Sequence, residues 1–130
     1  MAKIERFEDL EIWQKARELN KWILSICKYA ALSKDFEMVR HSKKTSGSIM
    51  DNIAEGFERG GNTEFRQFLS ISKGSTGEMK SQIYRCFDSE YIEQTYFDSL
   101  YKLIDDISKM LSGLINYLNN SDLKGRKFKQ

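Results

Sequence analysis

The chain has 130 residues, of which 40% are hydrophobic and 31% are charged, and its formal net charge at pH 7 is +2. These values are typical of one compact domain with a hydrophobic core, and they exclude a disordered chain and a two-domain enzyme. The absence of proline and the low glycine count favour long, uninterrupted helices over an all-β fold.

The first predicted helix covers residues 8–31, where core-type side chains recur every three or four positions. Its expected core-facing positions are Leu10, Trp13, Ala16, Asn20, Ile23, Cys27 and Ala30. Trp22, Ile26 and Tyr29 form a second apolar ridge that is rotated away from this stripe. Exposed aromatic side chains in a row usually mark a partner surface, so we expect an interface between copies of the chain here. The alternative is stacking on nucleic-acid bases.

Three more amphipathic patterns follow, so that four helices are expected. The four expected helices cover residues 8–31, 35–59, 63–88 and 96–119. Asp35 can cap the second helix, and Gly60 with Gly61 ends it. Because the links are short, neighbouring helices run in opposite directions, which predicts an all-α fold with a single antiparallel up-down-up-down four-helix bundle over residues 1–120. Residues 121–130 are expected to form a basic, flexible C-terminal tail.

A polar seam is expected between the second and third helices. Its predicted members are Ser48, Asn52, Glu55, Ser75, Glu78 and Gln82. Counting outward from the turn places Ser48 near Ser75, and glycine inside a helix costs about 1 kcal/mol relative to alanine, so Gly74 and Gly77 predict a close approach of the two helices. We favour a structural role, in which these polar groups satisfy one another. The alternative is a reactive site built on the two carboxylates and Asn52.

The sequence carries no motif for a metal, a cofactor or catalysis. A di-metal site in a helical bundle needs Glu-x-x-His motifs on facing helices, and the one histidine, His41, lies at the other end of its helix from Glu55. The GSTG stretch at residues 74–77 lacks the Lys-Ser/Thr pair and the preceding strand of a phosphate-binding loop. No nucleophile–base pair is recognisable either, so we expect no metal, no cofactor and no enzymatic activity.

The expected compartment follows from the first residues and the cysteines. The start, MAKIERFEDLEIWQK, lacks the apolar core and cleavage site of a secretory signal, and no run of about 18 apolar residues occurs. Cys27 and Cys86 fall at core-facing positions without a CxxC motif, which predicts buried, reduced thiols. We therefore expect a soluble cytoplasmic protein with no membrane partner.

Two groups of basic residues could bind nucleic-acid phosphates. The candidate residues are Arg40, Lys43 and Lys44 of the second helix and Lys124, Arg126, Lys127 and Lys129 of the tail. The same end of a bundle as the helix-two group is expected to hold Lys28, Lys34, Lys80 and Arg85. In the tail, Phe128 among the cations could stack on a base. The alternatives are an ordinary solvated helix face and a disordered, solubilising terminus.

Four segments carry a resemblance to a known family: FEDLEIWQKA at 7–16, SIMDNIAEG at 48–56, EFRQFLSISKGS at 64–75 and GEMKSQI at 77–83. In this order they resemble the bacterial four-helix bundle family named for proteins encoded in intervening sequences of 23S ribosomal RNA genes. The resemblance implies a helical bundle that assembles as a pentameric ring. A related branch comprises accessory proteins of diversity-generating retroelements, which bind nucleic acid and a reverse transcriptase.

From the residues and the resemblance together we expect a non-enzymatic homo-oligomer, a pentamer by the resemblance, that binds RNA or DNA through basic surfaces. The alternative is a protein scaffold or adaptor that contacts a nucleic-acid-processing protein, such as a reverse transcriptase, without binding nucleic acid itself.

Overall fold

The computed structural model describes residues 4–120 of the chain. Within this range it contains five α-helices, one short 3-10 helix and no strand. The elements are η1 (Phe7–Asp9), α1 (Glu11–Ile26), α2 (Ala30–Ser33), α3 (Phe36–Glu58), α4 (Asn62–Asp88) and α5 (Gln94–Asn119). The prediction of an all-α protein is therefore confirmed.

The predicted bounds of the last three long helices differ from those of α3, α4 and α5 by one or two residues at most. The single helix predicted over residues 8–31 is wrong, because the chain is interrupted twice. Leu10 has an extended backbone (φ −71°, ψ 123°) between η1 and α1, and Tyr29 has an extended backbone (φ −66°, ψ 143°) between α1 and α2. The apolar periodicity runs through both interruptions, so periodicity alone did not reveal them.

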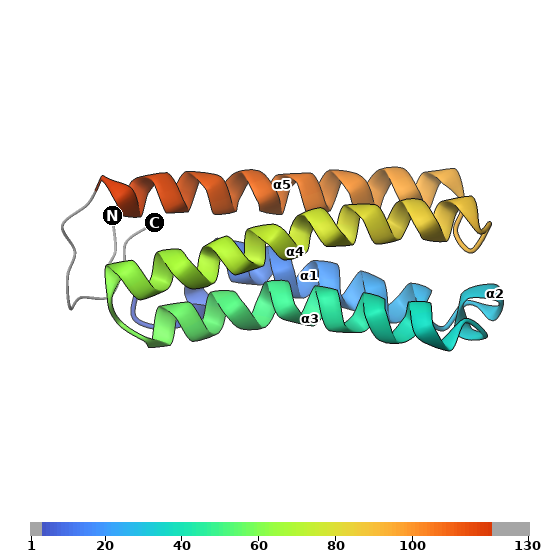
Figure 1. The fold of residues 1–130 in the computed structure, drawn as a ribbon, viewed down its shortest axis with the longest axis horizontal. Coiled ribbons are helices and arrows are strands. Elements are labelled where there is room, and N and C mark those ends of the chain that lie inside the picture. Colours follow the sequence, from blue (N-terminus) through green and yellow to red (C-terminus); the bar gives the residue numbers. More distant parts are fainter. Residues whose placement is uncertain (1–3, 121–130) are drawn as a thin grey trace.

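The four long helices α1, α3, α4 and α5 lie side by side, and the short α2 lies at one end of the molecule (Figure 1). Polar contacts fix how they pair. Ser72 Oγ on α4 donates to the Ile49 carbonyl on α3 at 2.8 Å, and Gln82 Nε2 donates to Thr45 Oγ1 at 2.9 Å. Going from Ser72 to Gln82 along α4, the partner on α3 changes from Ile49 to Thr45, which has the lower residue number. These two helices therefore run antiparallel. The α2 end therefore also holds the loop between α4 and α5.

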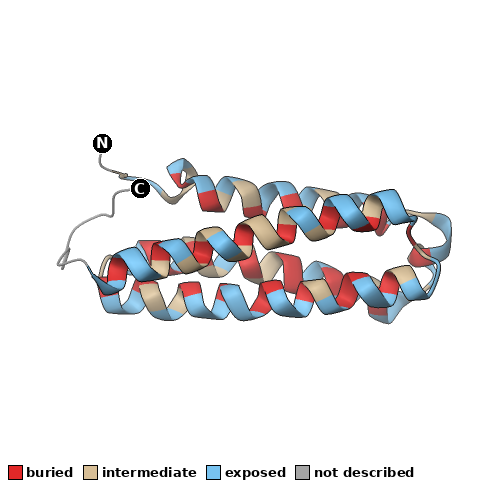
Figure 2. Cartoon of the chain, turned by 90° about the horizontal axis from the view of Figure 1, so that it is seen from above, coloured by how far each residue is buried: buried red, intermediate tan, exposed pale blue. Residues whose placement is uncertain are grey.

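The core is formed by the inward faces of all four long helices, and each long helix alternates buried and exposed residues along its length (Figure 2). The buried residues of α1 are Ile12, Ala16, Leu19, Ile23 and Ile26. The predicted core positions Leu10, Ala16, Ile23 and Cys27 are buried, and Ile12, Leu19 and Ile26 widen the stripe on one side. Asn20, which was expected to face the core, is only half-buried, whereas Ile26 is 1% exposed.

A close approach between α3 and α4 lies near their connecting turn, at Gly56. A Cβ atom added to Gly56 would lie 2.6 Å from Phe68 Cβ and 3.1 Å from Phe65 Cδ1. Gly60 then turns the chain with a left-handed backbone (φ 82°), which glycine adopts without steric cost. The close approach predicted at Gly74 and Gly77 is wrong, because a Cβ atom at either position would meet nothing within 4 Å.

The Gly56→Ala variant is expected to lose about 1–3 kcal/mol of unfolding free energy, because the new methyl group collides with the Phe68 Cβ, which cannot swing away. Gly113→Ala is the matched control in α5, where a Cβ meets nothing within 4 Å, and it should gain up to about 1 kcal/mol. Chemical denaturation at equal protein concentration measures both values. Equal effects of the two substitutions would contradict this account of the turn.

Candidate nucleic-acid interface

The polar seam between α3 and α4 is centred on two serines. Ser48 Oγ and Ser75 Oγ lie 3.0 Å apart, and Asn52 Nδ2 donates to Ser48 Oγ at 3.0 Å and to the Ser48 carbonyl at 2.8 Å. The predicted register, which placed Ser48 beside Ser75, is correct. Each of these three side chains thus finds a partner inside the subunit, as a structural role for the seam requires.

The predicted carboxylates do not belong to this seam. Glu55 is exposed and pairs with Arg59 one turn along α3, at 2.8 Å, while Glu78 is exposed on the outer side of α4. Gln82 is buried as predicted, although it contacts Thr45 and not the serine pair. The reactive carboxylate site considered from the sequence is therefore not formed, because its two acids point to solvent on different helices.

Two serines that were not among the predicted seam residues also connect the helices. Ser72 is fully buried and bonds to a carbonyl of α3, and Ser46 Oγ donates to Asn20 Oδ1 of α1 at 2.8 Å. A signal for Ser72 was present, because it lies on the same stripe as Leu69 and Met79. Serine and threonine on a core stripe thus act as contacts between helices in this protein.

The two cysteines lie inside the subunit. Cys27 and Cys86 are free and buried, and desolvation raises the pKa of Cys86 to about 11, so its thiol is neutral at physiological pH. Desolvation also raises the pKa of Cys27, against the opposing charge of Lys43. Across residues 4–120, His, Cys, Asp and Glu form no group of three that could hold a metal ion.

Three predicted phosphate contacts lie together on the first half of α3. Arg40, Lys43 and Lys44 are all exposed, and none of them forms an ion pair with another residue of the range 4–120. Arg40 and Lys44 are one helical turn apart and share a face, whereas Lys43 is turned toward α1, where its charge acts on Cys27. These cations are therefore accessible to a ligand.

Lys21 of α1 and Lys28 of the turn that follows α1 extend this group. The bond between Asn20 and Ser46 aligns the second half of α1 with the first half of α3, so that these two lysines lie at the same end of the bundle as the cations of α3. Both are exposed and have no ion-pair partner in the described part of the chain. We call the following five residues the basic face: Lys21, Lys28, Arg40, Lys43 and Lys44.

The basic face is nearly free of acids. Residues 21–28 and 36–47, which carry all five cations, contain a single acidic residue, Glu37. Lys21 was not among the predicted phosphate contacts, because it stands apart from the other cations in the sequence. Its spacing of seven positions from Lys28, which puts both on one side of a helix, was the available signal.

Other cations expected at this end of the molecule have different surroundings. Lys80 Nζ lies 2.9 Å from Asp105 Oδ1 and 5.0 Å from the ring centre of Tyr101, so it belongs to the contact between α4 and α5. Lys34 lies in a surface depression together with Asp35, and the charge of Arg85 also acts on Asp35. The basic surface is therefore a face of α1 and α3, which is narrower than the basic end predicted from the sequence.

The exposed ridge predicted on α1 is wrong. Ile26 belongs to the core, and the rings of Trp22 and Tyr29 are half-buried against Tyr96 of α5, with ring centres 6.1 Å and 5.6 Å from the Tyr96 ring centre. The contacts with Tyr96 show that this side of the chain faces α5. The large apolar side chains that are exposed among residues 4–120 are Leu24, Phe36, Ile71, Tyr84 and Tyr117.

Comparison with known families gives a match between residues 8–113 and the model of the 23S rRNA-intervening sequence protein family. The chain belongs to this family. A solved structure with a similar fold is a protein of unknown function from the S23 ribosomal protein family of Bacteroides thetaiotaomicron. Its TM-score is 0.75 at 23% sequence identity, over 80% of this chain and 97% of that one, so the likeness concerns the fold. A search of curated proteins gave no match.

In this member of the 23S rRNA-intervening sequence family, the basic face lies within the matched residues. The other predicted phosphate contacts, Lys124, Arg126, Lys127 and Lys129, lie outside the described residues. None of the helices in the described range 4–120 combines the length and the apolar character that a membrane span requires.

The first turn of α3, which leads into the basic face, is held by Asp35. Its carboxylate accepts a bond from the Met38 backbone N–H at 3.0 Å and another from the Tyr91 hydroxyl at 2.7 Å. These two bonds hold the pKa of Asp35 below its ordinary value, and the bond from the Met38 backbone has the larger effect. The prediction that Asp35 caps this helix is confirmed, and the bond from Tyr91 attaches the loop between α4 and α5 to α3.

The Tyr91→Phe variant is expected to raise the pKa of Asp35 toward its ordinary value of about 3.9, because one of the two bonds to the carboxylate is lost. A lowered pKa stabilises the fold above the unfolded-state pKa, and this contribution is lost as the pH falls through the folded-state pKa. The stability deficit of the variant should therefore be present at neutral pH, shrink as the pH falls below about 3.9, and disappear below the lowered folded-state pKa of Asp35.

Carboxyl NMR titration of Asp35 and acid unfolding measure the two effects. Tyr117→Phe is the control, since Tyr117 is exposed near the opposite end of α5. An unchanged Asp35 titration in Tyr91→Phe would refute the assigned role of the hydroxyl.

Proposed function

We propose that the protein is a non-enzymatic, self-associating, up-down-up-down four-helix bundle that binds RNA or DNA through its basic face. The observation that carries this proposal is the presence of five exposed cations on α1, the turn after it and the adjacent α3, without an ion-pair partner in the described range. Elsewhere, Arg59, Lys80, Lys102 and Lys109 are paired with carboxylates. Unpaired cations are the ones that can replace counterions on a phosphate backbone.

The shape of the basic face suits a phosphate backbone. Arg40 and Lys44 are separated by about 6 Å along α3, and the axes of packed helices are about 8–10 Å apart. The face is therefore large enough to contact several consecutive phosphates, which lie a few ångströms apart along a strand. The side chains are long and mobile, so they can follow a backbone without a fixed geometry.

An exposed aromatic ring borders the basic face. Phe36 is 79% exposed at the start of α3, and Arg40 and Lys44 follow it at intervals of one helical turn. An aromatic ring in line with cations is the combination with which proteins bind single strands, because the ring can stack on a base while the cations contact phosphates. This arrangement favours a single-stranded ligand over a duplex.

The triple variant Arg40→Ala, Lys43→Ala, Lys44→Ala is expected to weaken single-stranded RNA binding and to reduce the slope of log K against log salt by about 2, since each phosphate contact contributes about 0.7. The control removes the same charge elsewhere, in Lys73→Ala, Lys102→Ala, Lys109→Ala. Fluorescence anisotropy over a salt series, with nuclease-treated protein, gives both slopes. Equal slopes for the two variants would overturn the assignment to the basic face.

Self-association is supported by the outer side of α4. Gly74 and Gly77 lie inside this helix and are exposed, so the subunit contains nothing that offsets their cost of about 1 kcal/mol each. Ile71 beside them is 51% exposed. Small side chains let two helices approach closely, and an exposed isoleucine gains from being covered. We propose this side of α4, in place of the ridge predicted on α1, as the contact between copies in a ring of five.

The Ile71→Lys variant is expected to lower the average mass in light scattering, because a charged side chain cannot be buried between two copies. Tyr117→Lys, at a residue that is 41% exposed on α5, is the control and should keep the mass of the wild type. A monomeric wild type, or a mass that falls only in the control, would exclude this contact.

A second candidate function is a protein adaptor that does not bind nucleic acid. Tyr84, which is 49% exposed on α4 and packs on Phe97 and Tyr101, supports this candidate as a partner-facing aromatic residue outside the basic face. An adaptor should retain a defined protein partner after nuclease digestion, whereas loss of every partner on digestion would count against it.

A further inference from the structure

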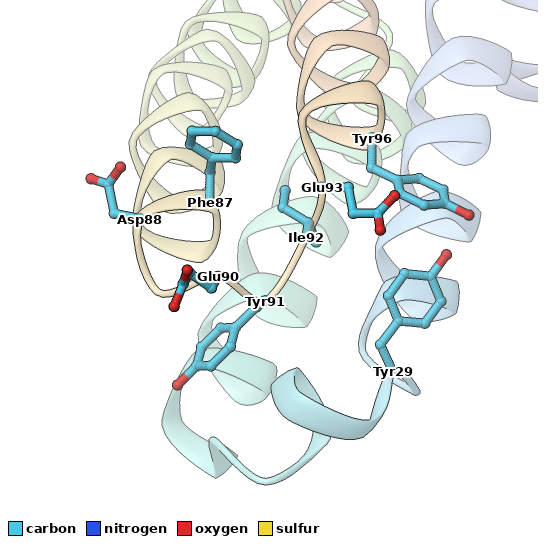
Figure 3. Close-up of a pocket in the computed structure, with 8 residues that line it drawn as sticks. All are labelled: Tyr29, Phe87, Asp88, Glu90, Tyr91, Ile92, Glu93 and Tyr96. Carbon is cyan, nitrogen blue, oxygen red and sulfur yellow. The ribbon is translucent and has the colours of Figure 1, made fainter.

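A cavity of about 910 Å³ lies at the α2 end of the molecule, between the turn after α1 and the loop that joins α4 to α5. Figure 3 shows its lining residues. Three tyrosines and three carboxylates dominate the lining: Tyr29, Tyr91, Tyr96, Asp88, Glu90 and Glu93. We call this cavity the acidic pocket.

The walls of the acidic pocket are fixed within the subunit. The Tyr91 hydroxyl donates to Asp35 Oδ2 at 2.7 Å, and the rings of Tyr29 and Tyr96 meet edge to face with their centres 5.6 Å apart. Ile92, between the carboxylates, is 5% exposed and anchors the loop in the core. A ligand would therefore find the tyrosines already in place, which reduces the entropy cost of binding.

The carboxylates of the acidic pocket have no cationic partner in its lining. Among residues 4–120, no lysine or arginine lines the pocket, and none of its three carboxylates forms an ion pair. Glu93 precedes α5, where negative charge is favourable, but Asp88 and Glu90 lie at the C-terminal end of α4, where it is not. The pocket thus presents a net negative charge to solvent.

This lining is suited to the side chains of lysine and arginine. Carboxylates pair with their charge, and the faces of tyrosine rings attract cations within about 6 Å of the ring centre. The volume exceeds that of one side chain, so the cavity can take a short stretch of peptide. A basic segment that also contains an aromatic residue would use both kinds of wall.

The chain itself contains such a segment. Residues 124–129 hold Lys124, Arg126, Lys127, Phe128 and Lys129 and no acidic residue. We propose that the acidic pocket binds this basic C-terminal segment, residues 124–129, of a second copy of the chain. The complementary charge and the matching aromatic content support this occupant over an acidic or a purely apolar one.

The length of α5 excludes the pocket of the same copy. This helix has 26 residues and begins at the acidic pocket, so its C-terminal end lies about 39 Å away. Lys127, seven residues beyond Asn120, reaches at most about 25 Å even in a fully extended chain. Only another copy can therefore bring this segment into the pocket.

The proposed contact has a direction, because each copy offers its C-terminal segment at one end and its pocket at the other. Contacts of this kind build closed rings where the geometry closes and filaments where it does not. The inference goes beyond nucleic-acid binding and needs only that two copies meet. While residues 124–129 are bound in a neighbour's pocket, they cannot contact RNA. The acidic pocket and RNA therefore compete for this segment.

The test is the binding of a fluorescein-labelled peptide of residues 121–130 to full-length, nuclease-treated protein, followed by anisotropy without nucleic acid. We expect saturable binding that the double variant Glu90→Gln, Glu93→Gln weakens at least tenfold. The control variant Glu18→Gln, Glu58→Gln loses the same charge elsewhere and should bind as the wild type does. Equal affinities of the two variants, no binding, or equal binding of an unrelated peptide of the same charge would overturn the proposal.

A second measurement identifies the donor of the segment. Mixed ¹⁴N- and ¹⁵N-labelled full-length chains are treated with a carbodiimide, which joins lysines directly to carboxylates, and the products are identified by mass spectrometry. Cross-links of mixed isotope between Lys124, Lys127 or Lys129 and residues 88–93 are expected. Cross-links to the pocket that are confined to single-isotope products would overturn the second-copy assignment. Because no RNA is added, these outcomes are separable from a failure of the basic face to bind nucleic acid.

Discussion

The contact between α3 and α4 determines where the other parts of the molecule lie. The core side of α3 includes Ser42, Thr45 and Ser46, so large apolar side chains alone do not fix its register. Hydrogen bonds do this instead: Ser48 meets Ser75, and Ser72 reaches a carbonyl of α3. A buried hydrogen bond contributes only about 1 kcal/mol net, but an unmade one costs about 1–3 kcal/mol, so a register shift is penalised repeatedly. The outward direction of Arg40 and Lys44 follows from this register.

Much of the fold was predictable because periodicity and turn residues agree in α3, α4 and α5. The prediction was incomplete in α1, where Leu10, Ala16, Ile23 and Cys27 are buried as expected but Ile12, Leu19 and Ile26 are buried too. Only the packing against α3 and α5 decides how wide the buried side is, and that information is not local. The same error placed Ile26 on the surface and left Tyr96 unnoticed as the partner of Trp22. The extended backbone at Tyr29 was not predicted, because the apolar periodicity continues through it.

The candidate site was predictable in part. Arg40, Lys43 and Lys44 were identified because they cluster in sequence, whereas Lys21 and Lys28 join them only through the packing of α1 on α3. Glycines show the same limit. Gly56 and Gly74 look alike in the sequence, yet the first lies against Phe68 and the second faces open space, because burial depends on the neighbouring helix. Sequence spacing identifies a helix face, and tertiary structure decides what that face meets.

The hydrogen bond from Tyr91 to Asp35 has a consequence for communication across the molecule. It joins the loop after α4 to the first turn of α3, one turn ahead of Arg40, so a displacement of the loop removes a hydrogen bond from the start of the cationic helix. By thermodynamic reciprocity, any ligand that prefers one position of Tyr91 alters the free energy of that helix start, and a ligand that alters the helix start acts on the loop. The Tyr91 hydroxyl thus couples the acidic pocket to the start of the helix that carries Arg40 and Lys44.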